Sequence, residues 1–129
     1  DEVKLEEQSA SKDTIRLERG GKEYTIGVIT IPTFYADFQA MQAGDPNYKS
    51  TTRDVRNLIA ELEADGVDGL VMDLRNNGGG ALHEANDLVG LFIDKGPTVQ
   101  IRNANNDVAA DWLSVPRPLV RAPFRLCVP

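Results

Sequence analysis

The sequence has one cysteine, one histidine and no long apolar run, and these shortages argue against disulfide-bonded, zinc-binding and membrane-spanning proteins. Its one cysteine, Cys127, cannot form a disulfide within the chain, so cysteine content does not reveal the compartment. Its one histidine, His83, is followed by an acidic residue, but a zinc-binding helix of the H-E-x-x-H type needs a second histidine. Apolar runs are short, and none approaches the roughly 20 residues that cross a bilayer. We therefore expect no internal disulfide, no metal site and no membrane-spanning helix.

Basic residues are also scarce. The 14 lysines and arginines are outnumbered by 20 acidic residues, and the formal net charge is -6. Lysine and arginine are scattered rather than clustered, so the positive surface that binds phosphate backbones is missing. The G-x-G-x-x-G and Walker patterns that hold nucleotides are missing too. The composition therefore argues against nucleic acid as a partner and against a nucleotide cofactor.

Length and hydrophobic content fit one domain or part of one. The chain has 129 residues, of which 41% are hydrophobic. Residues 1–13 are polar and charged, so we expect a flexible lead-in there. Residues 14–108 carry the periodic apolar patterns of a folded core. Residues 109–129 are rich in proline and arginine and show little periodicity, which predicts an atypical tail.

The core begins with a pattern that predicts a β-hairpin. From Thr14 onward, apolar and polar residues alternate on either side of Gly20 and Gly21, which supply the positive φ of a tight turn. The second arm runs to Pro32, which has no amide proton to give to a sheet. Residues 33–49 then predict a short helical turn followed by a surface loop.

A helix is expected next, beginning near Ser50 or Thr51. A hydroxyl at either position can cap the first amides, and Asp54 has the spacing of a capping-box acid. Apolar residues at helical spacing follow on one face, and Gly66 ends the pattern.

The second half of the core predicts a strand, a helix and another strand. Residues 69–74 are apolar nearly throughout, which is typical of a strand buried on both faces. A helical stripe over residues 82–93 is closed by Gly96 and Pro97, and a strand follows at residues 98–102. The alternation of strands and helices predicts an α/β layer with crossover connections.

A glycine-rich loop joins the buried strand to the next helix. Residues 73–82 read DLRNNGGGAL. Backbone amides in such a turn are not shielded by side chains and lie beside the positive end of a helix, so they can point together at an anion. Phosphate binding is disfavoured by the missing motifs, which leaves an oxyanion hole for acyl transfer. The structural alternative is that the glycines only let the strand turn sharply.

The pattern D-L-R-x-N-x-G-G after an apolar strand resembles the signature of the tail-specific, or carboxy-terminal processing, proteases, a family of Ser/Lys peptidases. Residues 27–35, GVITIPTFY, resemble the strand that opens the core of that family. Residues 84–97 resemble the helix and turn after its glycines, and the match extends over residues 14–102. The resemblance implies an α/β fold with a crotonase/ClpP-like core, incomplete here, behind the N-terminal β-hairpin.

The resemblance also implies roles for five residues of the loop. Gly79 and Gly80 would form the oxyanion-hole region, with the amide of Gly79 as the first choice of donor. Asp73, Arg75 and Asn76 would hold the turn. A buried Asp and Arg need each other or backbone partners, because an unpaired buried charge is costly. For these supporting residues a structural ion pair without a catalytic part is the favoured interpretation.

The resemblance stops before the catalytic dyad. Residues 118–120, PLV, resemble the start of the strand that leads to the nucleophilic serine, but the residues after them depart from the pattern. We assign no serine or lysine of this chain to catalysis, and one hypothesis is a truncation or a frame change in the parent gene. The prediction is the N-terminal part of the catalytic core of a serine endopeptidase, inactive by itself. The alternative is a non-catalytic α/β module that binds peptides or other subunits.

Partners and location follow from the same resemblance. It implies protein or peptide substrates with exposed C-termini, no metal or organic cofactor, and the bacterial periplasm. An incomplete sheet would leave an apolar edge, so we also expect self-association. Phe34, Tyr35 and Phe38 could line a substrate groove, although covering the sheet is the favoured interpretation. His83 is expected to be a solvated residue of the first helical turn.

Overall fold

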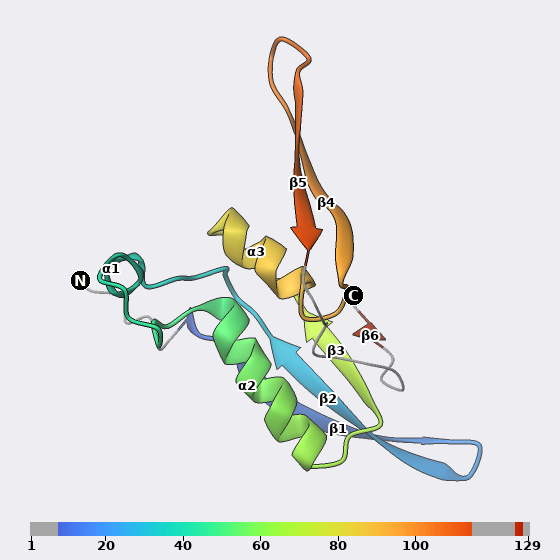
Figure 1. The fold of residues 1–129 in the computed structure, drawn as a ribbon. Helices are drawn as coiled ribbons and strands as arrows, with labels where there is room; N and C mark the ends of the chain where they lie inside the picture. Colours follow the sequence, from blue (N-terminus) through green and yellow to red (C-terminus); the bar gives the residue numbers. More distant parts are fainter. Residues whose placement is uncertain (1–7, 115–125, 128–129) are drawn as a thin grey trace.

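The computed structural model describes residues 8–114 and 126–127 (Figure 1). In chain order the elements are β1 (Ser11–Arg19), β2 (Lys22–Thr30), α1 (Phe38–Gln42), α2 (Thr51–Ala64), β3 (Gly69–Asp73), α3 (Leu82–Val89), β4 (Lys95–Arg102), β5 (Val108–Ser114) and β6 (Leu126–Cys127). Four strands form one sheet in the order β1-β2-β3-β6, and β4 pairs with β5 in a second sheet. No helix in these ranges has both the length and the apolar character needed to cross a bilayer.

The predicted N-terminal hairpin is confirmed. β1 and β2 pair antiparallel over their whole length, starting with Ser11 opposite Thr30. Gly20 and Gly21 make the turn with φ of 63° and 76°, which residues with a side chain rarely adopt. Ser11–Asp13, expected in a flexible lead-in, belong to β1, because backbone pairing with β2 continues there regardless of the polar side chains.

The middle of the chain forms a strand-helix-strand unit. β2 and β3 are parallel neighbours, with Ile26 opposite Gly69, and α2 connects them across one face of the sheet (Figure 1). A parallel pair joined by a helix is the basic α/β unit, so this part of the predicted α/β layer is confirmed. The expectation that the strand at residues 98–102 would join the same layer is wrong, because β4 pairs with β5 instead.

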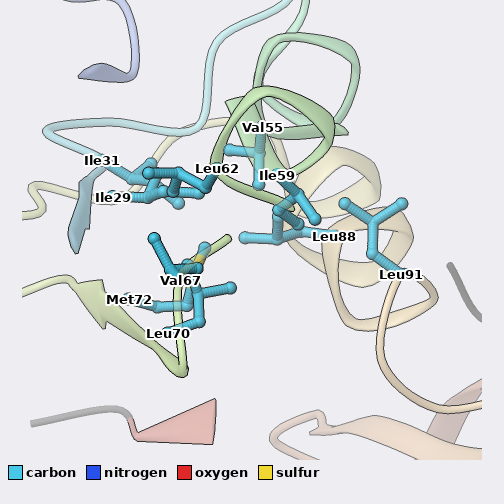
Figure 2. Close-up of a cluster of buried hydrophobic side chains, with 10 residues drawn as sticks. All are labelled: Ile29, Ile31, Val55, Ile59, Leu62, Val67, Leu70, Met72, Leu88 and Leu91. Atoms are coloured by element: carbon cyan, nitrogen blue, oxygen red, sulfur yellow. The ribbon is translucent and has the colours of Figure 1, made fainter. Parts of the chain in front are cut away.

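Helices α2 and α3 pack on the sheet through a cluster of 10 buried apolar side chains (Figure 2). They are Ile29, Ile31, Val55, Ile59, Leu62, Val67, Leu70, Met72, Leu88 and Leu91. Alternate residues of β2 and β3 point to this face, and the helices contribute residues at helical spacing. A Cβ atom on the buried Gly27 would lie 2.8 Å from Leu62 Cδ1, so glycine lets α2 lie close to β2.

The start of α2 follows the prediction only in part. The helix begins at Thr51, and the Oγ of Ser50 accepts an N–H of the first turn at 3.4 Å. The capping-box role expected for Asp54 is wrong, because its Oδ2 accepts the hydroxyl of Tyr35 at 2.5 Å. The helix ends before Gly66, as predicted, and φ of that residue is 75°.

The later part of the chain departs from the sequence prediction. α3 ends at Val89, and Gly96 and Pro97, expected to close a longer helix, lie inside β4. Pro97 borders a register shift between β4 and β5, a position that suits a residue without an N–H. β5 covers residues 108–114, most of which were expected in the atypical tail. Backbone pairing with β4 places this segment in a strand, although its sequence lacks apolar alternation.

The remaining predictions for the ends of the chain lie partly outside the described residues. Residues 1–7 of the lead-in and residues 115–125 and 128–129 of the tail are not among them. Leu126–Cys127 form β6, which pairs parallel with β3 and completes the four-stranded sheet.

The close packing of α2 on β2 generates a stability prediction. Leu62 is 1% exposed, so Leu62→Ala should lower the free energy of unfolding by about 2–5 kcal/mol, through lost burial and a residual cavity. Leu82→Ala is the matched control, because Leu82 is 43% exposed and its loss should cost less than about 1 kcal/mol. Urea denaturation followed by circular dichroism measures both values, and equal losses would contradict the packing described.

Candidate functional site

The glycine triplet lies at the junction between β3 and α3, as the sequence predicted. It runs beside the segment that follows β2. Phe34 N–H donates to Gly79 O at 2.8 Å, and Ala81 N–H donates to Phe34 O at 2.8 Å. Gly80 and Phe34 therefore form a parallel bridge that extends the β2–β3 pairing beyond the ends of both strands.

The three glycines of the loop differ in how strictly glycine is required. Gly80 has φ of 135°, and a Cβ atom on it would lie 2.2 Å from Phe34 O, so any side chain there would collide with backbone. Gly79 has φ of 95°, where side chains are strained, but its Cβ position is open. Gly78 is constrained by neither effect. The close approach at Gly80 thus sets the shape of the loop.

Asn77 holds the loop from inside. Its Nδ2 donates to Ile31 O at 2.9 Å, and its Oδ1 accepts Gly79 N–H at 2.7 Å. Thr33 Oγ1 also donates to Gly79 O at 2.8 Å. The resemblance implied that Asn76 holds the turn together with Asp73 and Arg75, and the structure shows Asn76 exposed. The signal for Asn77 was available, because it occupies the fixed asparagine position of the D-L-R-x-N-x-G-G pattern.

The amides of the loop are mostly engaged within the protein. Gly78 N–H donates to Pro32 O at 3.2 Å, Gly79 N–H to the asparagine side chain, and Ala81 N–H to a backbone oxygen. Within the described part of the chain, Gly80 N–H has no acceptor, and Gly80 is exposed. Gly79 N–H, the predicted first choice of donor, would have to break its 2.7 Å bond before it could bind a substrate. One amide, rather than a converging group, is available to an anion.

Asp73 and Arg75 form the expected ion pair at the end of β3. Arg75 Nη2 donates to Asp73 Oδ2 at 2.7 Å, and its Nε and backbone N–H donate to Asp73 Oδ1 at 2.9 and 3.1 Å. The expected burial of the pair is wrong for Arg75, whose side chain is 71% exposed, and Asp73 is half-buried, with 15% of its side chain exposed. The side-chain and backbone hydrogen bonds from Arg75 lower the pKa of Asp73 to about 2. The pair braces the turn without reaching the glycines.

Glu84 ties the first turn of α3 to the first turn of α2. Its carboxylate is 1% exposed, and its Oε2 accepts Thr52 N–H at 2.8 Å. Thr52 Oγ1 donates to Glu84 O at 3.2 Å. A buried carboxylate is favourable here because the free N–H groups of a helix start carry partial positive charge.

A second set of bonds ties the segment after β2 to α2. Tyr35 N–H donates to Thr51 Oγ1 at 2.7 Å, and Thr51 N–H donates to Tyr35 O at 3.0 Å. The Tyr35 hydroxyl donates to Asp54 and accepts Ala10 N–H at 3.0 Å. Burial and the hydrogen bond to Asp54 raise the pKa of Tyr35 well above its ordinary value. Phe34, the neighbour of Gly80, is thereby anchored through the next residue.

The aromatic residues and His83 take the following places. Tyr35 is buried, Phe34 packs against the core cluster and Phe38 is 51% exposed. A cleft of about 510 Å³ is lined by the first half of α2, by α3 and by the loop before α2, and none of these three aromatics lines it.

His83 is exposed, and its Nε2 lies 3.7 Å from Glu84 Oε1. Among residues 8–114 and 126–127, no group of three or more His, Cys, Asp or Glu side chains is placed to hold a metal.

Sequence comparison relates the chain to known peptidases. A profile of peptidase family S41 matches residues 25–120. The tail-specific protease of Haemophilus influenzae is 41% identical over 104 residues, which cover 81% of this chain and 12% of that protein. A probable CtpA-like serine protease of Staphylococcus saprophyticus is 31% identical over 103 residues, which cover 74% of this chain and 21% of that protein. The chain therefore spans a small part of the length of these relatives.

Structural comparison agrees on the fold. The photosystem II D1 C-terminal processing protease aligns with 92% of this chain and 29% of its own, with a TM-score of 0.63 and 22% identity. A peptidase structure from Parabacteroides merdae aligns with 93% of this chain and 35% of its own, with a TM-score of 0.52 and 18% identity. At these identities the likeness establishes a shared fold.

The collision at Gly80 generates a matched pair of substitutions. Gly80→Ala should lower the free energy of unfolding by more than about 2 kcal/mol, because the new methyl group meets Phe34 O and the backbone strain adds to the clash. Gly78→Ala should change it by less than about 0.5 kcal/mol, since its Cβ position is open. Denaturation curves measure both, and faster hydrogen exchange at Ala81 N–H should accompany Gly80→Ala alone. Equal tolerance of both changes would disprove the bridge.

The Asp73–Arg75 pair generates a pH prediction. The folded-state pKa of Asp73 lies below its ordinary 3.8, so the stabilisation by the ion pair is complete above that pH and is lost as pH falls toward 2. Carboxyl carbon NMR should show an Asp73 midpoint near 2, and Arg75→Gln should move it back toward 3.8. Arg56→Gln, at an exposed position on α2, is the control that should leave the midpoint unchanged. An ordinary midpoint in the unaltered protein would contradict the ion pair.

Proposed function

Because this chain belongs to peptidase family S41, we propose that it forms part of the catalytic core of a serine endopeptidase that cleaves proteins at their C-terminal tails. Two things support the proposal. The family match covers the β2–α2–β3 unit and the glycine loop. The relative from Haemophilus influenzae is named a tail-specific protease. Substrates of this chain would then be proteins or peptides with exposed C-termini.

Gly80 N–H is the observation that carries the proposed mechanism. It is the amide of the loop without an acceptor in the described residues, and it sits beside the start of α3. When a nucleophile attacks a peptide carbonyl, negative charge develops on the oxygen, and a fixed N–H donor stabilises it without having to reorient. We assign this role to Gly80, with Gly79 beside it as part of the same region. Asn77 and Phe34 hold the donor in place.

The nucleophile and base are proposed to come from a Ser/Lys dyad that none of the residues assigned above supplies. A serine hydroxyl needs a base within hydrogen-bond reach, and the lysine would take its proton as the bond to the carbonyl carbon forms. Ser50 is buried and already caps α2 through its hydroxyl, so it is committed to structure. We therefore propose that the chain by itself has no hydrolytic activity. A crotonase/ClpP-like arrangement of the whole core and a periplasmic location complete the proposal.

A non-catalytic peptide-binding or interaction module is the second candidate. The observation in its favour is that the amides of Gly78, Gly79 and Ala81 are all bonded within the protein. A loop with a purely structural role would look the same except at Gly80. The oxyanion-hole proposal predicts a loss of kcat when the Gly80 N–H is displaced in an active enzyme. The binding-module alternative predicts no loss.

A chimeric protein distinguishes the two candidate functions. The matching 104-residue segment of the Haemophilus influenzae tail-specific protease is replaced by the corresponding part of this chain, and cleavage of a C-terminal peptide substrate is followed. We expect turnover from the chimera, because the segment supplies a working oxyanion donor. In the chimera Gly80→Ala keeps the backbone N–H but displaces it, because the new methyl group would collide with Phe34 O, so kcat should fall by about 10²–10³-fold with little change in KM. Gly78→Ala should lower kcat less than about threefold, since its Cβ position is open.

Two further measurements complete the experiment. The 129-residue chain alone, incubated with a fluorophosphonate that labels reactive serines, should remain unlabelled. Circular dichroism of each chimera shows whether the variant is folded. Labelling of the isolated chain would refute its inactivity. A folded Gly80→Ala chimera with full kcat would refute the donor role and favour the binding module.

A further inference from the structure

β1 is the outer strand of the four-stranded sheet, and its far edge has no strand partner among the described residues. All nine residues of β1 are exposed. Figure 1 shows that the turn end of the β1–β2 hairpin extends past β3. The N–H and C=O groups along a long, exposed edge can pair with another strand, and such edges are where chains associate. This edge is independent of the glycine loop and of the proposed function.

The two faces of β1 differ in what covers them. Lys12 lies on the face toward α2, where its Nζ is 2.9 Å from Glu61 Oε2 and 3.4 Å from Asp65 Oδ2. Because successive side chains of a strand point to opposite faces, Ile15 and Leu17 lie on the other face, where they are 48% and 53% exposed. On β2 this face continues with the half-buried Tyr24, Ile26 and Val28. The edge therefore borders an apolar face opposite the helices.

The sequence of β1 places an acidic and a basic residue, Asp13 and Arg19, at equal distances on either side of Arg16. Two antiparallel copies of β1 can therefore pair unlike charges. We propose that β1 pairs antiparallel with β1 of a second copy of this chain, about a two-fold axis at Arg16. In this register Asp13 lies opposite Arg19 of the second copy, and Ile15 lies opposite Leu17. The axis repeats both pairs, so unlike charges flank an apolar centre on a single face. Directly opposed unlike charges and apolar pairs both stabilise antiparallel strands, and a two-fold interface repeats every gain.

A register centred on Ile15 is the main competitor, and it is less favourable. There Asp13 would lie opposite Leu17, which sets a carboxylate against an apolar side chain. Lys12 would lie opposite Glu18, but Lys12 is already held by two carboxylates of α2 and its C-terminal end. That register gains no charge pair on the apolar face.

The proposed register has one unfavourable contact. Arg16 lies opposite its own copy at the axis, and like charges directly opposed weaken a pair of strands. Arg16 Nη1 lies 3.9 Å from Glu23 Oε1 on β2, which offsets part of this repulsion. Arg16 also points to the face opposite Ile15 and Leu17, so the apolar centre is unaffected.

Sedimentation equilibrium of the 129-residue chain tests the proposal. The unaltered chain should form dimers. Asp13→Arg and Arg19→Asp should each weaken the dimer about tenfold, since each change turns two attractive contacts into repulsive ones. The combination of both substitutions restores unlike pairs and should bring the dissociation constant back to within about threefold. Ile15→Lys, which charges the apolar centre, should abolish dimers.

Glu18→Lys separates the two registers. In the proposed register Glu18 lies opposite Thr14, so the dimer should be unaffected, whereas a register centred on Ile15 would set it against Lys12 and weaken the dimer. Circular dichroism confirms that each variant is folded. A monomer at about 0.5 mM, a dimer indifferent to both charge reversals, or a double variant that stays weak would each overturn the proposal. Loss of affinity with Glu18→Lys would overturn the register.

Discussion

The backbones of Gly80 and Phe34 approach each other so closely that a methyl group on Gly80 would lie 2.2 Å from the Phe34 oxygen. Two backbone hydrogen bonds of 2.8 Å, one on each side of Gly80, hold this contact. The contact extends the parallel β2–β3 pairing past the strand ends and brings the chain directly into α3. The result is an N–H beside a helix start that has no acceptor in the described part of the chain, and the proposed chemistry depends on it.

The start of α2 keeps both sides of that contact in position. Thr51 bonds to the backbone of Tyr35, which follows Phe34, and Thr52 bonds to Glu84 in the first turn of α3. Buried carboxylates and hydroxyls are stable there because each has a hydrogen-bond partner. The glycine loop is thus supported by segments that lie far apart in the sequence and meet at one helix end.

Much of this arrangement is predictable from local sequence. The glycine pair predicts the hairpin turn, because only the positive φ found at Gly20 and Gly21 closes it tightly. The apolar run after Gly66 predicts a buried strand, and the glycine triplet predicts a strand-to-helix junction. The hydroxyl bond of Asp54 was missed because its partner, Tyr35, lies in another part of the chain. Asn77 was missed although the glycine-loop pattern marks its position, because its bond to Ile31 O forms only in the folded chain. β5 was missed because its order comes from pairing with β4 rather than from its own periodicity.

What the sequence by itself determined is the order of the elements from β1 to β4 and the place of the glycines, since turn chemistry and apolar spacing act between near neighbours. Tertiary structure decided which amide of the loop is available. Gly78, Gly79 and Ala81 look alike in sequence to Gly80 as donors, yet each is engaged by a partner that only the fold brings near. Hydrogen bonds between distant segments depend on how β2, β3 and α2 pack, and no local pattern encodes that packing.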